Sequence, residues 1–214
     1  MPSRQRTTPT QQRSEATVDA ILDAAERVLA EDGYRRFSTN RIAKVASFSI
    51  GTVYRYFADK AAIIEAMRAR AEADIMRQLT DAVVQMKEIE SSEVAVTTFL
   101  RALIEALEAH ADVLQAVSNE LPFGAQFNVL PDAERQLGDL VRLAVETRVP
   151  HIDSDKLDAT LYLSIGATLA VATRIAIGRP SGISRDLLIE TANEVTLPYA
   201  RLLESQPGSQ GRNR

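Results

Sequence analysis

The sequence contains no cysteine and no tryptophan, and it has only two histidines among its 214 residues. Without cysteine, the chain cannot form disulfides, thiolate metal sites or a cysteine nucleophile. His110 and His151 lie in separate segments, and no HExxH, GxSxG, phosphate-loop or Glu-x-x-His pattern occurs. The sequence therefore predicts no catalytic residue, no metal site and no cofactor. An enzyme built on a helical bundle is kept only as an alternative.

Long apolar runs are also missing. The longest candidate for a membrane span, 157–178, is interrupted by polar and charged side chains before it reaches the roughly 18 residues required. The first residues lack the apolar segment of a secretory signal. Together with the absence of cysteine, these features predict a cytoplasmic protein that has no membrane partner.

Charge is distributed unevenly along the chain. Residues 1–60 hold ten Lys and Arg against seven Asp and Glu, a net charge of +3. Residues 61–214 hold fifteen against twenty-two, a net charge of −7, so the whole chain carries −4. A basic head on an acidic body indicates that an anionic partner, if there is one, binds at the head.

Apolar residues recur at helical spacing from end to end, and no run of alternating residues indicates a strand. The polar segments 1–13 and 205–214 are predicted to be a disordered basic arm and a disordered tail. Pro198 is expected to kink or split the last helix. The predicted fold is all-α, with about nine helices near residues 14–32, 38–46, 49–56, 60–86, 92–110, 112–121, 131–148, 153–178 and 184–204.

The first three helices have the outline of a helix-turn-helix, since the second and third are separated by only three residues. Ser38 and Ser49 are suited to cap these two helices, and Gly33 is suited to end the first. Ala43 is small enough for close packing, and Phe48 can fill the space between the helices. The remaining buried positions are predicted to be Ile42, Val53 and Phe57. On this pattern alone, a plain corner of a helical bundle is an equal alternative.

Residues 14–67 closely resemble the DNA-binding region of the tetracycline-repressor (TetR) family. The matching positions are Gly33-Tyr34, Thr39, Ile42-Ala43, Gly51-Thr52, Tyr54, Phe57 and Lys60. The resemblance implies a helix-turn-helix DNA-binding domain over 14–60, with its recognition motif near 37–56. It also implies a helical effector-binding and dimerisation domain over 61–204. One departure is Ser47, which stands in the turn where the family usually has Gly; a positive φ there would cost Ser more than Gly.

The resemblance further implies which residues contact DNA. The start of the recognition helix would enter the major groove, Asn40 would suit an adenine edge, and Lys60 would lie beside a phosphate. The basic arm, with Arg4, Arg6 and Arg13, would either reach the minor groove or remain an inert tail. The expected DNA-binding residues are Thr39, Asn40, Lys44, Ser49, Ile50, Gly51, Thr52, Tyr54, Arg55, Tyr56 and Lys60.

For the body, the resemblance implies a homodimer and a pocket for a small effector. The expected dimer interface is built from the last two helices, at Gly166, Ala170, Leu187, Leu188, Val195, Leu202 and Leu203. The expected effector-binding residues are Met86, Phe99, Leu103, Asn119, Phe123, Gln126, Phe127, Tyr162 and Arg174. Their apolar character predicts a largely apolar effector, although aromatic residues at helical spacing are more often plain core.

The predicted function is that of a repressor that binds an inverted-repeat operator in double-stranded DNA and is released by its effector. The alternative is an effector-independent, architectural DNA-binding protein. Binding without sequence preference would favour a head far more basic than +3.

Overall fold

The structure, a computed structural model, describes residues 9–85, 91–120, 132–148 and 153–204. Within these ranges the chain forms nine α-helices, one 3₁₀ turn and no strand, which confirms the predicted all-α class. The elements in chain order are α1 (Pro9–Asp32), η1 (Tyr34–Arg36), α2 (Thr39–Val45), α3 (Ile50–Tyr56), α4 (Lys60–Gln85), α5 (Ser92–Ala109), α6 (Ala111–Glu120), α7 (Ala133–Arg148), α8 (Ser154–Gly178) and α9 (Arg185–Glu204).

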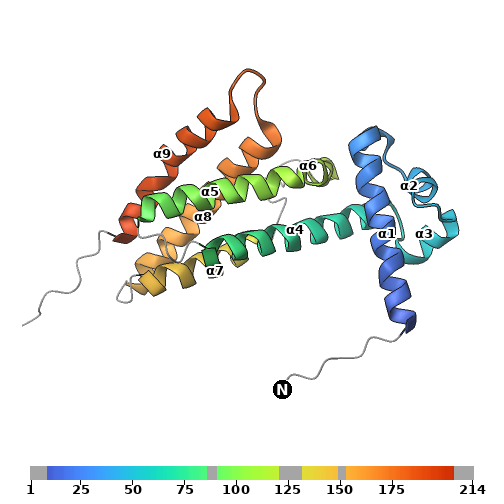
Figure 1. Cartoon of the computed structure of the whole chain (residues 1–214), viewed down its shortest axis with the longest axis horizontal. Coiled ribbons are helices and arrows are strands. Elements are labelled where there is room, and N and C mark those ends of the chain that lie inside the picture. The colour runs from blue at the N-terminus through green and yellow to red at the C-terminus, as the bar shows by residue number, and fades with distance from the viewer. Residues whose placement is uncertain (1–8, 86–90, 121–131, 149–152, 205–214) are drawn as a thin grey trace, which may run out of the picture.

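The molecule is elongated, with a small head at one end and a larger body at the other (Figure 1). Helices α1, α2 and α3 form the head, and α4 runs from the head into the body. The 26 residues of α4 span about 39 Å. One stripe of α4 is buried over its whole length, at Ile63, Met67, Ile75 and Leu79. The same helix therefore contributes to the core of both parts.

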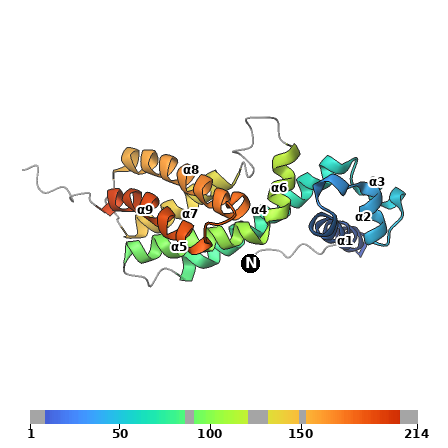
Figure 2. The same ribbon diagram turned by 90° about the horizontal axis from the view of Figure 1, so that it is seen from above.

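In the body, α5 packs against α4, α8 and α9, while α7 packs against α4 and α8 (Figure 2). The buried side of α5 is a run of large aliphatic side chains, Leu100, Leu103, Ile104 and Leu107. The short helix α6 leaves this bundle and contacts both α4 and α1. The head is thus held by two elements, the long helix and α6.

Side-chain caps set where several helices begin. The carboxylate of Asp59 accepts a hydrogen bond from the backbone N–H of Ala62 at 2.8 Å, and that of Asp153 accepts one from Lys156 at 2.9 Å. Such caps satisfy backbone N–H groups that have no partner within the first helical turn. They explain why the predicted start of α4 is correct and that of α8 lies within one residue of the observed one.

Two sequence expectations are wrong at the helix ends. The predicted arm 1–13 is not separate from the first helix, because α1 already begins at Pro9 and contains Arg13. Proline is favoured in the first turn of a helix, and glutamine continues a helix readily. Arg4 and Arg6 lie outside the described residues. At the other end, α9 runs without a break through position 198, so that proline does not split it.

Helix α8 is a long and largely apolar helix. By length and composition alone it could cross a membrane, so the expectation that no segment reaches this threshold is wrong. The core helix of a soluble protein passes the same test, and α8 packs against α5, α7 and α9. Only 22% of its most apolar window is buried within the chain, however. Much of its apolar surface therefore remains uncovered in a single chain.

Candidate nucleic-acid interface

The core of the head is the one that the sequence predicts. Ile42, Ala43, Val53 and Phe57 are buried, and the partly buried Phe48 packs against them. These residues fix α2 and α3 to α1, because the three helices share one apolar core. The opposite side of α2 and α3 is left for polar and exposed residues.

Both predicted caps in the head are present. The Ser38 hydroxyl accepts a hydrogen bond from the backbone N–H of Arg41 at 3.3 Å. The Ser49 hydroxyl accepts one from the N–H of Thr52 at 3.0 Å and also pairs with the Thr52 hydroxyl at 2.9 Å. The caps fix the first turns of α2 and α3, which hold most of the predicted DNA contacts.

The turn between α2 and α3 closes with a Schellman motif. The backbone N–H of Phe48 donates to the carbonyl of Ala43 at 2.9 Å, and that of Ser47 donates to Lys44 at 3.3 Å. This motif places its central residue in the left-handed conformation, usually as glycine. Here the residue is Ser47, with φ 58°, the only non-glycine residue with a positive φ in the part of the chain that the structure describes. Ser47 therefore does occupy the positive-φ conformation in which serine costs more than glycine.

The predicted contact residues of α2 and α3 lie mostly on one polar surface. On α2, Asn40 and Lys44 are exposed. On α3 and its cap, the exposed residues are Ser49, Ile50, Gly51, Tyr54 and Arg55. The two helices are also linked across this surface, because the hydroxyls of Thr39 and Tyr54 lie 3.3 Å apart. The structure thus brings together residues 10 to 15 positions apart in the sequence.

Tyr56 connects the end of α3 to α1. Hydrogen bonding with the hydroxyls of Ser14 and Thr17 lowers the pKa of Tyr56. On its other side, the Arg55 guanidinium lies 5.0 Å from the Tyr56 ring centre and donates to its hydroxyl at 3.3 Å. Arg55 and Tyr56 therefore form a pair that is oriented by the first helix.

Lys60 begins α4 and has a partner that sequence reasoning missed. Its ammonium lies 4.2 Å from the centre of the Tyr34 ring and donates to the Tyr34 hydroxyl at 3.0 Å. A cation over an aromatic ring is attracted by the ring's electron density. In the sequence, Gly33-Tyr34 is part of the motif shared with the family. In the structure, Tyr34 orients Lys60.

Two sets of ion pairs brace the head. Asp32 receives a two-point contact from the Arg41 guanidinium, with Nε to Oδ2 at 2.6 Å and Nη2 to Oδ1 at 3.4 Å. This contact holds the pKa of Asp32 below its usual value. Arg70 of α4 binds both Asp23 and Glu26 of α1, each at 2.7 Å. None of these pairs was predicted, because each joins residues from elements whose relative placement the sequence does not specify.

The predicted effector-binding residues do not gather into one lining. Leu103 is buried and Phe99 is partly buried, as part of the aliphatic core of the body. Asn119 and Arg174 are exposed, and Tyr162 is 75% exposed, so within one chain these three do not face an interior pocket. Residues at surface positions follow the same helical spacing as core residues, and the effector-binding role of these residues stays a prediction. Met86, Phe123, Gln126 and Phe127 lie outside the described residues.

The predicted dimer residues divide into two groups. Leu187 and Val195 of α9 are 53% and 55% exposed, Ala170 is also exposed, and Leu188 is partly buried. Gly166, in contrast, faces its own chain, because a Cβ built there would lie 3.5 Å from Oε1 of Glu134 in α7. The side chains of Leu202 and Leu203 are not among those that the structure describes. The exposed members form the candidate interface surface.

His110 is the histidine that lies within the described residues, and it belongs to a group of polar contacts between helices. His110, between α5 and α6, pairs through Nε2 with Oδ2 of Asp74 in α4 at 2.9 Å. Asp74 is also bound by Arg77 and Gln78, and these partners, with His110 first, hold its pKa far below the usual range. This group fastens the α5–α6 junction to α4. His151 lies outside the described residues.

Residues 21–67 match the sequence profile of a family described as bacterial regulatory proteins, tetR family. An uncharacterized HTH-type transcriptional regulator of Mycobacterium tuberculosis is 36% identical over 90 residues, which cover 42% of this chain and 45% of that protein. This chain thus matches somewhat less than half the length of that relative.

Solved structures extend the likeness to the body. A TetR-family transcriptional regulator from Pectobacterium atrosepticum superposes with a TM-score of 0.69 at 20% identity, covering 95% of this chain and all of that one. The fatty acid degradation regulator FadR from Bacillus halodurans gives 0.59 at 21% identity, covering 90% and 97%. At these identities the likeness concerns the fold. Residues 21–67 thus carry the sequence profile of the tetR family of bacterial regulatory proteins, and the chain as a whole has the fold of solved TetR-family regulators.

Proposed function

We propose that the protein is a transcriptional repressor that binds an inverted-repeat operator as a homodimer and is released by a small effector. In this proposal residues 14–60 are the DNA-binding domain and residues 61–204 bind the effector and form the dimer. The observation that carries it is the polar surface of α2 and α3, which exposes residues at the family's DNA-contacting positions.

The first turn of α3 is proposed to enter the major groove. Ser49, Ile50 and Gly51 are exposed there, and Gly51 lacks a side chain that would keep the backbone away from the bases. Asn40, on the neighbouring α2, carries an amide that matches the donor and acceptor of an adenine edge. Thr52 is partly buried and already bonded to Ser49, so its hydroxyl is oriented before DNA binds. These residues would give sequence preference.

The surrounding residues are proposed to bind phosphates. Lys60 is oriented by Tyr34, and Arg55 by Tyr56, so each cation is held near one position before binding. Tyr54 presents a hydroxyl that is paired with Thr39, and Lys44 is exposed. Contacts to phosphates set the register on DNA without reading its sequence.

The dimer is proposed to form through α8 and α9. Tyr162 and Leu163 of α8 and Leu187 and Val195 of α9 are all more than half exposed. A soluble monomer rarely leaves such a group of large apolar residues in water. A two-fold dimer would place its two recognition helices about 34–36 Å apart, or a multiple of that distance, on one side of DNA. The operator should therefore be an inverted repeat.

Effector release and location complete the proposal. The body makes up most of the chain and is joined to the head through α4 and α6, so a compound bound there can change the placement of the head. The expected coupling of about 1–3 kcal/mol would change operator affinity roughly 5–150-fold. In keeping with its family, the protein is proposed to act in the cytoplasm and to have no enzymatic activity.

Selection of bound sequences from random double-stranded DNA tests the proposal. The expected result is a shared inverted repeat. Asn40→Ala should relax preference at particular bases at a cost of about 1–3 kcal/mol, whereas Lys60→Ala should weaken all sequences alike and reduce the salt dependence. Arg27→Ala, an exposed cation elsewhere on α1, is the matched control and should change neither. Bound DNA with no shared sequence would instead support the architectural alternative.

A further inference from the structure

Glu72 is a buried carboxylate in the middle of α4. The residue is only 6% exposed, and one of its oxygens, Oε2, accepts a hydrogen bond from Nη1 of Arg68 at 2.6 Å. The other oxygen, Oε1, is buried and has no hydrogen-bond partner among the described residues. A buried carboxylate oxygen without a donor destabilises the folded state, because it has lost its hydrogen bonds to water and has no protein hydrogen bond to replace them. Such an atom calls for a donor.

Arg68 does not satisfy this second oxygen, because its hydrogen bonds go to Glu65 and to Oε2 of Glu72. Its Nε and Nη2 bind the two carboxylate oxygens of Glu65 at 2.9 and 2.6 Å, and only Nη1 reaches Glu72. One positive charge therefore serves two carboxylates. Glu65 is largely exposed and is also solvated, whereas Glu72 depends on Arg68 alone. The excess negative charge of Glu65, Arg68 and Glu72 is thus located at the buried Glu72.

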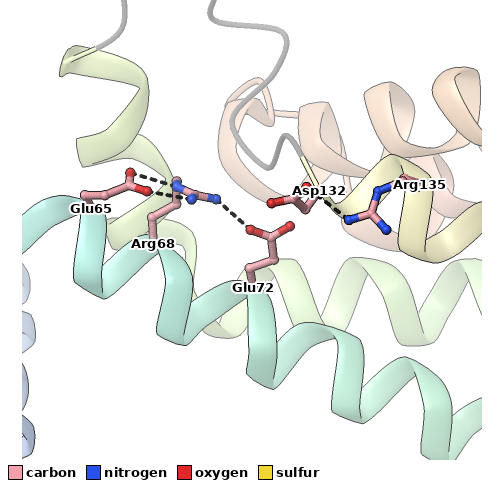
Figure 3. Close-up of polar contacts among 5 residues, drawn as sticks. All are labelled: Glu65, Arg68, Glu72, Asp132 and Arg135. Atoms are coloured by element: carbon pink, nitrogen blue, oxygen red, sulfur yellow. Dashed lines mark hydrogen bonds and ion pairs between the residues drawn. The ribbon is translucent and has the colours of Figure 1, made fainter.

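Figure 3 shows that the Glu72 carboxylate points away from α4, toward the start of α7. The charged groups drawn on that side in Figure 3 are Asp132 and Arg135, which pair with each other at 3.2 Å and are both exposed. Arg135 is therefore already matched by Asp132 and adds no surplus positive charge. Together with Glu65 and Arg68, the five side chains comprise three carboxylates and two cations. The buried Glu72 carboxylate thus points toward the exposed pair of Asp132 and Arg135 (Figure 3).

The two helices that pack here, α4 and α7, also contribute buried apolar residues. Ala71 and Ile75 of α4 and Ala133 and Leu137 of α7 are buried and belong to the same hydrophobic core. In such surroundings the attraction between opposite charges is stronger than in water. The site therefore combines an apolar wall with one unmatched acceptor that carries negative charge.

We infer that Glu72 binds a cationic nitrogen of the effector, a primary amine or amidine attached to an apolar body. This inference rests on the proposed function, in which the body takes a small effector. It also modifies the expectation of a largely apolar effector by adding one positive, hydrogen-bond-donating group. An N–H donor fills the need of Oε1, and its charge balances the excess that Glu65 and Glu72 leave on Arg68.

The position of Glu72 also connects the site to the head. Arg70, two residues earlier on the same helix, holds α1 through Asp23 and Glu26. A ligand held by Glu72 would therefore act on the helix that is fastened to the DNA-binding head.

The test compares arylalkyl amines with alcohols of the same length, for example 4-phenylbutylamine with 4-phenylbutanol, by calorimetry on the full chain. Amines should bind about tenfold tighter or more, since hydrogen bonds between charged groups exceed neutral ones. Glu72→Gln keeps the shape, removes the charge and should abolish this preference. Glu65→Gln, which alters the exposed carboxylate on the same arginine, is the matched control and should retain it.

The inference is overturned if no amine in the panel binds tighter than its alcohol, or if Glu72→Gln keeps the preference. Oε1 would then be satisfied by a proton or a water molecule. If Glu72→Gln does not fold, Glu72→Asp, which retains the charge, should keep the amine preference at lower affinity, and its loss would count equally against the inference. Operator binding is measured separately, so a wild type that binds operator but prefers no amine refutes the inference and leaves the proposed function standing.

Discussion

Ser47→Gly should stabilise the protein, because Ser47 has a left-handed backbone at an exposed position. A residue with a Cβ pays about 1–2 kcal/mol for this conformation, which glycine adopts freely. The substitution also costs about 0.4–1 kcal/mol of stability, because glycine has more conformational freedom in the unfolded state. With the middle of each range, the net gain is about 0.8 kcal/mol. For a chain of this size, that gain corresponds to a rise in Tm of roughly 1–4 °C.

Thermal unfolding followed by circular dichroism, at one fixed protein concentration, measures this shift. Ser47→Ala is the matched control, since it keeps the Cβ in the left-handed region and should bring no comparable gain. The hydrogen bonds of the turn join backbone atoms of Phe48 to Ala43 and of Ser47 to Lys44, so neither variant removes them. A glycine variant no more stable than the wild type would refute the reasoning, as would an alanine variant that gains as much.

Three further predictions concern the head and the candidate dimer surface. Asp32→Asn should lower Tm at pH 7, because Arg41 holds the pKa of Asp32 below its ordinary value of 3.8. The stabilisation from this pair is present above pH 3.8 and is lost as the pH falls through the lowered pKa of the folded state. The melting curves of the two proteins should therefore converge in acid. Tyr34→Phe keeps the ring beneath Lys60 but loses the 3.0 Å hydrogen bond, and should weaken binding to all DNA sequences alike in a filter-binding assay; a change in base preference would contradict the positioning role. Leu187→Asp should shift sedimentation toward the monomer, and an unchanged dimer would exclude Leu187 from the interface.

The head was predictable because its determinants are local. Ser38 and Ser49 act on backbone groups three residues away, and Gly33 directly follows the last residue of α1. The buried positions of α2 and α3 follow from spacing within two short helices. Local signals of this kind are read directly from the sequence, and here the predicted caps, turn and core are all confirmed.

The polar contacts between elements were not predictable. Arg41 could have faced solvent or either neighbouring helix, and only the packing of α1 against α2 brings it to Asp32. Glu72 was missed for a related reason. It falls beside the apolar stripe of α4, where a charged residue ordinarily extends to water, and its burial depends on α7, a helix far away in the sequence. A possible signal was Arg68, four residues earlier, which marks a partner on the same side of the helix.

In the body, the spacing of apolar residues did not predict how they pack within one chain. Tyr162 has the helical spacing of a core residue, yet it points out of the single chain. Gly166 was assigned to the dimer surface for its small size, but it faces Glu134 of α7. An apolar residue on an apolar helix can face a core, a ligand or a second chain, and periodicity alone does not distinguish these partners.

The contact of α1 with both α4 and α6 has a kinematic consequence. Because the head is held by both α4 and α6, it cannot swing freely. When these two helices slide relative to each other, the head rotates about one axis. Because α4 is about 39 Å long, a tilt of about 5° moves its end by about 3.4 Å. That displacement equals the spacing of one base pair along DNA. The head can therefore lose its register on a rigid operator after a rearrangement of the body too small to disturb the core.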